Sequence, residues 1–82
     1  MTMDLQTLKH ILDAEDIDPI AYSLDGGMPF EAYVLERRAG HWVVFYSEHG
    51  LRTGETEFEA EGDACSYLLE LLLRDSTTRR KR

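Results

Sequence analysis

The apolar run Trp42-Val43-Val44-Phe45-Tyr46 limits the possible folds more than any other stretch of the chain. Consecutive β-branched and aromatic residues are typical of a strand with little exposed surface. The run predicts a strand over His41–Ser47, which follows a strand over Phe30–Arg38 and the short turn Ala39-Gly40. A central β-hairpin is therefore expected.

Pairing across the Ala39-Gly40 turn fixes which side chains share a face of this hairpin. The predicted cross-strand pairs are Arg38–His41, Leu35–Val44 and Tyr33–Tyr46. Val34, Val43 and Phe45 fall on the opposite face, so both faces are apolar. Either one helix covers each face, or one face is partly exposed and binds a partner. In the second case the partner includes a second copy of the chain, which would give a homodimer through that face.

The other helices and strands are predicted from the spacing of apolar residues and from the residues that interrupt helices and strands. A helix with the stripe Leu5, Leu8, Ile11 and Leu12 is expected after a cap at Asp4 or Thr2. Ile20–Leu24 and Thr53–Glu59 are expected as strands, and a last helix runs from Glu61 to about Arg74. The prediction is an α+β fold, a four-stranded antiparallel meander sheet flanked by an N-terminal and a C-terminal helix. Residues 1–75 form a single domain, and 76–82 form a disordered basic tail.

Composition narrows the class of protein. No apolar run approaches the roughly 20 residues of a membrane span, and the N-terminus has no signal-peptide pattern. Cys65 is the one cysteine, so no disulfide is expected, and its place on an apolar helix face predicts a buried, inert thiol. A chain without disulfides suits a reducing compartment, so the expected location is the cytoplasm.

Charge is distributed unevenly along the chain. Residues 1–74 hold 15 acidic and 5 basic residues, a formal charge of −10, whereas residues 75–82 carry +3. An acidic body repels nucleic acid and anionic membranes and attracts basic proteins. We expect a basic protein partner, and neither direct nucleic-acid nor membrane binding; plain solubility is the alternative explanation of the charge.

No catalytic or metal-binding constellation is recognisable. His10, His41 and His49 lack ligands at the short spacings of zinc sites, so no metal is expected. Asp25-Gly26-Gly27 is too short for a phosphate-binding loop, and Cys65 has no accompanying base. The chain is expected not to be an enzyme and to use no cofactor.

Two neighbouring segments are the candidate partner-binding surface. The segment after the third strand mixes an aromatic residue, both signs of charge and a glycine, and the fourth strand carries glutamates at alternate positions. The candidate residues are Tyr46, Glu48, His49, Arg52, Glu55, Glu57 and Glu59. The alternatives are an ordinary turn with a Glu48–Arg52 ion pair and Gly50 at positive φ, and glutamates that merely keep an edge strand soluble.

Several motifs resemble a family of small bacterial immunity proteins, which are encoded beside polymorphic or contact-dependent toxins. The matching residues are Tyr22-Ser23-Leu24-Asp25-Gly26-Gly27, Tyr33, Glu36, Trp42 to Gly50, Phe58, Ala64-Cys65 and Tyr67-Leu68-Leu69. The resemblance covers residues 4 to about 75 and implies a cytoplasmic antitoxin that blocks one cognate toxin. His49 departs from the family pattern, which has an arginine there, so the contact at this position is expected to differ.

The sequence thus favours an immunity protein that occludes a cognate toxin domain, expected to be a basic, nuclease-like effector. A small acidic adaptor or regulatory module is the first alternative. A small ligand-binding protein or enzyme, built on the loops at Tyr22–Asp25 and Tyr46–Arg52, is the second, and a deep polar pocket would favour it.

Overall fold

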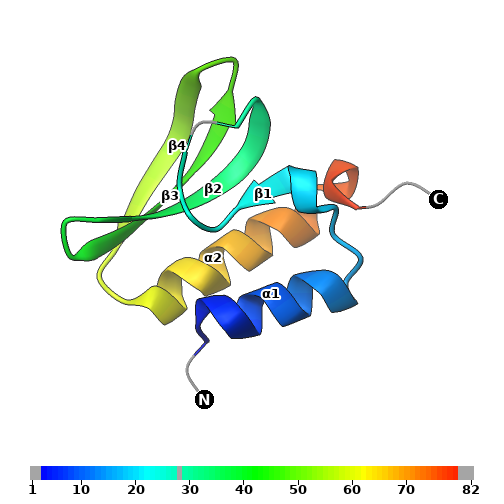
Figure 1. Cartoon of the computed structure of the whole chain (residues 1–82), viewed down its shortest axis with the longest axis horizontal. Coiled ribbons are helices and arrows are strands. Elements are labelled where there is room, and N and C mark those ends of the chain that lie inside the picture. Colours follow the sequence, from blue (N-terminus) through cyan, green and yellow to red (C-terminus); the bar gives the residue numbers. More distant parts are fainter. Residues whose placement is uncertain (1–2, 28, 80–82) are drawn as a thin grey trace.

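The computed structural model describes residues 3–27 and 29–79 and has the predicted α+β class (Figure 1). The elements are α1 (Leu5–Ala14), the 3₁₀ turn η1 (Pro19–Ala21), β1 (Tyr22–Ser23), β2 (Glu31–Arg38), β3 (His41–Glu48), β4 (Leu51–Phe58), α2 (Glu61–Arg74) and the 3₁₀ turn η2 (Ser76–Thr78). The strands form one sheet in the order β1-β2-β3-β4.

The two helices are connected to each other at their N-terminal ends. The Asp4 carboxylate accepts a hydrogen bond from the Thr7 amide at 2.8 Å and so caps α1 as expected. At the start of α2 Ala60 offers no side-chain cap. Instead the carboxylate of Glu61 accepts a hydrogen bond from the Leu5 amide at 2.9 Å, which fixes the first turn of α1 against the first turn of α2.

Both helices lie on the same side of the sheet (Figure 1). The first of the two alternatives, in which one helix covers each face, is therefore wrong. The main core joins this face of β2 and β3 to the apolar sides of α1 and α2, and its fully buried members are Leu8, Leu12, Ile17, Leu35, Val44, Ala64, Cys65, Leu68 and Leu72. Trp42 is only partly buried at its margin. We call this side of the sheet the helix face and the other side the outer face.

Three apolar side chains on the outer face are nonetheless buried. Val34 and Val43 are fully inaccessible and Phe45 is 1% exposed. Part of the cover is the crossover between β1 and β2, where Gly26 lies against the Glu36 side chain. This cluster is therefore not available as an apolar docking surface.

The hairpin register is confirmed. Arg38 pairs with His41, Leu35 with Val44 and Tyr33 with Tyr46. Two tight turns connect the three long strands, and both have two residues at positive φ: Ala39-Gly40 (49° and 86°) and His49-Gly50 (50° and 79°). Such turns match the right-handed twist of a hairpin. The segment Glu48–Arg52 is thus not a loop, because β3 extends to Glu48 and β4 starts at Leu51.

The first strand departs from the predicted meander. Ile20 and Ala21 lie in η1, and only Tyr22 and Ser23 form β1, which runs parallel to β2. A parallel pair needs a crossover rather than a tight turn. Here the chain crosses the outer face, where the Ser47 hydroxyl donates to the Pro29 carbonyl at 2.6 Å, before β2 begins. The Asp25-Gly26-Gly27 segment therefore bends a crossover and does not close a hairpin.

The chain after α2 is also more ordered than predicted. Disorder was expected from residue 76 onward, but residues 76–78 form η2 and Thr78 is 4% exposed. The Thr78 carbonyl accepts a hydrogen bond from the Asp18 amide at 2.8 Å, and Arg79 donates to the Glu15 carbonyl at 2.7 Å. Residues 76–79 are thus docked on the segment after α1; residues 80–82 of the predicted tail lie outside the described residues.

We expect Thr78→Val to lower the melting temperature by roughly 5–10 °C. The Thr78 hydroxyl lies 2.8 Å from the carbonyl oxygens of both Leu72 and Asp75. Valine has the same shape but no donor, and an unsatisfied buried carbonyl costs about 1–2 kcal/mol. Thermal melts followed by circular dichroism measure the effect. Thr53→Val, which alters an exposed hydroxyl, is the matched control; equal melting of both variants and wild type would contradict the docking of η2.

We also expect the Cys65 thiol to be unreactive in the folded protein. Burial, and to a smaller extent the charges of Glu61 and Asp4, raise the pKa of Cys65 to about 11. At pH 8 its reaction with a disulfide reagent should be at least about 100-fold slower than in denaturant, because the thiolate is the reactive form. Since the pKa rises on folding, stability should fall as pH increases from about 9 towards 11. Equal rates in folded and unfolded protein would contradict the burial of Cys65.

Candidate partner-binding site

The predicted partner-binding residues separate into two groups. Tyr46, Glu48 and His49 lie where β3 ends and turns into β4, whereas Arg52, Glu55 and Glu57 lie along β4. Glu59 follows directly after β4 and is exposed. The structure therefore brings each group together but does not merge the two into one patch.

Arg52 belongs to an ion-paired network over the outer face. Its guanidinium lies 3.6 Å from the Glu36 carboxylate and 4.6 Å from the centre of the Phe45 ring. Arg38 bridges Glu36 and Glu55, the latter at 2.7 Å. Arg52 thus pairs with Glu36, and the alternative of a Glu48–Arg52 ion pair is wrong. Because its guanidinium lies over the Phe45 ring, Arg52 contributes to packing as well as to surface charge, and Glu55 joins the same network through Arg38.

Strand β4 forms one edge of the sheet and is exposed along most of its length. Its register with β3 is irregular between Val44 and Tyr46, where Gly54 has φ 64°. The Glu57 carboxylate lies 3.3 Å from Nε2 of His41, and 66% of its side chain is exposed. Glu59 and Asp63 make no ion pair with any described residue. The result is an acidic edge strand that no described strand covers.

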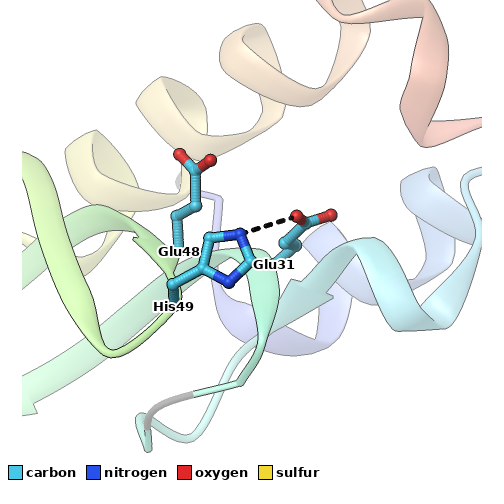
Figure 2. Close-up of side chains that lie close together, drawn as sticks. All are labelled: Glu31, Glu48 and His49. Atoms are coloured by element: carbon cyan, nitrogen blue, oxygen red, sulfur yellow. Dashed lines mark ion pairs between the residues drawn. The ribbon is translucent and has the colours of Figure 1, made fainter.

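At the other end of the sheet, two glutamates face each other directly. Glu31 of β2 pairs in register with Glu48 of β3, and like charges at such positions destabilise a sheet. The His49 ring reaches towards them (Figure 2), with Nε2 3.5 Å from the Glu31 carboxylate. An edge-on contact with Phe30, at 4.6 Å between ring centres, holds this ring. The ligand atoms of the three residues lie within 4.8 Å of one another, a group that could also coordinate a divalent cation.

A half-open pocket of about 620 Å³ adjoins this end of the sheet. Its lining combines two tyrosines of the sheet with acidic residues from three separate segments. The lining residues used below are Asp18, Glu31, Tyr33, Tyr46, Asp75 and Arg79. The tyrosine rings meet edge to face, with centres 4.8 Å apart. Ile20, of which 79% is exposed, also contributes to the lining.

Hydrogen bonds and charges give the pocket a negative character. The Tyr33 hydroxyl donates to the Asp75 carboxylate at 3.0 Å, and burial together with this carboxylate raises the pKa of Tyr33 to about 12. Burial and then the charges of Glu31, Glu48 and Asp75 raise the pKa of Tyr46. Hydrogen bonds from Thr77 and Tyr33 lower the pKa of Asp75, which is therefore ionised at neutral pH.

Tyr46 and Glu48 are among the candidates predicted from the sequence, but most residues of this pocket are not. The register that pairs Tyr33 with Tyr46 gives Glu31 opposite Glu48 when it is continued by two residues, so this pair was detectable. Asp75 and Arg79 gave no local signal, because they reach the pocket only through the docking of η2.

No protein-family model, curated protein or solved structure matches this chain. Among the described residues, no helix is both long enough and apolar enough to cross a membrane.

Proposed function

We propose that this protein is an immunity protein, which binds a cognate bacterial toxin domain with a basic surface and blocks it. The observation that carries the proposal is the uncovered acidic edge of β4, where Glu57 and Glu59 are exposed and Asp63 follows in the first turn of α2. The motif resemblance described above supports the toxin as the partner.

The proposed contact uses the edge of the sheet. A basic extended segment of the toxin pairs with the free backbone groups of β4, and its lysines and arginines lie against the glutamates. Charge complementarity of this kind accelerates encounter and suppresses wrong partners. Bound there, the domain occludes the basic cleft with which a nuclease holds its substrate.

A ligand-binding function receives support from the pocket of about 620 Å³, and it enters the further inference below. Catalysis in this pocket has less support. The described lining contains no cysteine, histidine or serine, and the hydroxyls of Thr77 and Thr78 are already hydrogen-bonded. Cys65 is buried in the main core.

The experiment that tests the proposal is co-expression with the product of the neighbouring gene. We expect cells that carry both to grow, cells that carry the neighbour alone to stop growing, and the two proteins to co-purify through an affinity tag. Growth arrest in the presence of this protein, without co-purification, would overturn the proposal. If the neighbouring gene product alone does not stop growth, it is not a toxin, and the proposal fails as well.

A further inference from the structure

We infer that the pocket between η1, η2 and the ends of β2 and β3 binds a guanidinium or ammonium group, supplied by an arginine or lysine side chain of a protein partner. This inference extends the proposed function, from which it takes only the basic nature of the partner. It concerns a site separate from the β4 edge.

The described lining of the pocket is rich in acidic groups. Asp18, Glu31 and Asp75 contribute three carboxylates, and Glu48 lies directly opposite Glu31 across the ladder. Two glutamates in direct cross-strand register destabilise the sheet unless a cation or a proton screens them. The described part of the chain provides only His49 at this position, at 3.5 Å from Glu31.

The one cation of the described lining, Arg79, is engaged outside the pocket. The Arg79 guanidinium donates to the Glu15 carbonyl at 2.7 Å and lies 3.7 Å from the Glu15 carboxylate, at the end of α1. Its charge is thus shared with an acidic group outside the pocket. Asp75 keeps its negative charge, since its partners Thr77 and Tyr33 are neutral donors.

Two aromatic rings lie beside the carboxylates of the lining. Tyr46 is half-buried beside Tyr33, and an aromatic ring next to carboxylates is the arrangement that holds cationic groups. The pocket is large enough for a whole side chain and open enough for one that is attached to a partner's backbone. Its acidic lining does not suit an anion or a wholly apolar group.

The test uses the full chain and two small probes of nearly the same shape that differ in charge: the cationic N-acetyl-arginine amide and its neutral analogue N-acetyl-citrulline amide. Binding is followed by ¹H–¹⁵N NMR in buffer with EDTA, so that no divalent cation occupies Glu31, Glu48 and His49. We expect the arginine probe to bind at least about tenfold more tightly, with the largest shifts at Tyr33 and Tyr46. Equal binding of both probes, or shifts confined to β4, would overturn the inference.

Four variants locate the site. Glu31→Gln removes one exposed carboxylate of the lining and should weaken arginine binding at least about threefold. Glu70→Gln makes the same chemical change on the exposed side of α2, outside both the pocket and the β4 edge, and should leave it unchanged. Tyr46→Phe should retain binding, whereas Tyr46→Leu should lose it, if the ring supplies the contact. Equal affinity of Glu31→Gln and wild type contradicts the assignment, whichever result the co-expression experiment gives.

Failure of the two proposals can be told apart. The probes bind or do not bind without any toxin, so their failure leaves the β4 interface untouched. Conversely, a protein that fails to rescue growth can still bind the arginine probe, in which case the pocket serves a basic partner of another kind.

Discussion

Replacing Phe45 by alanine is expected to abolish cooperative unfolding of this protein. Phe45 is 1% exposed and fills the outer-face cluster with Val34 and Val43. Removal of a buried phenylalanine costs about 3–5 kcal/mol, and small domains sit at the low end of the usual range of roughly 5–15 kcal/mol. The Arg52 guanidinium, 4.6 Å from the ring, would also lose the surface on which it lies. Urea titration followed by circular dichroism measures the change.

Trp42→Ala is the informative comparison, because Trp42 packs against the main core on the helix face and not in the outer-face cluster. The structure leaves it partly buried, with the Arg37 guanidinium 5.7 Å from the ring. We therefore expect a smaller loss, about 1–3 kcal/mol, and a transition that stays cooperative. A Trp42 variant that unfolds before the Phe45 variant would show that the outer-face cluster contributes less to stability than its burial indicates.

Reversal of two charges at the β4 edge is expected to slow association with the basic partner at least about tenfold at low salt. The association rate should also depend less on the salt concentration. Glu57→Lys with Glu59→Lys is the appropriate pair. Glu55 of this strand is ion-paired with Arg38, so its reversal would also disrupt the network that Arg38 forms with Glu36. Stopped-flow or surface-binding kinetics at several salt concentrations give both quantities.

The control for this pair changes the same net charge on the helices. Asp13→Lys with Glu70→Lys breaks two exposed ion pairs, to Lys9 and Arg74, and surface pairs of this kind contribute little to stability. We expect the control to retain most of the association rate. If both double variants slow association equally, net charge rather than the β4 edge attracts the partner, and the proposed contact surface is wrong.

Local chemistry determined most of the secondary structure. In the stripe predicted for the first helix, Leu8 and Leu12 are fully buried and Leu5 packs against the core, because a helix presents such positions on one side, while Ile11 is half-buried. The hairpin register also follows from sequence alone. With Ala39-Gly40 fixed as a two-residue turn, the period of two leaves one way to pair β2 with β3.

The tertiary structure decided the rest, since contacts between distant residues have no local signal. Placement of both helices on one face is fixed by links such as Glu61 to Leu5, which lie 56 positions apart. Burial of the outer face depends on long side chains, Arg38 and Arg52, meeting Glu36 above Phe45. The acidic pocket exists only because η2 docks beside η1, through the bond from the Asp18 amide to the Thr78 carbonyl, and brings Asp75 to Tyr33. Such pairings are chosen by packing of the whole chain, so no window of the sequence contains them.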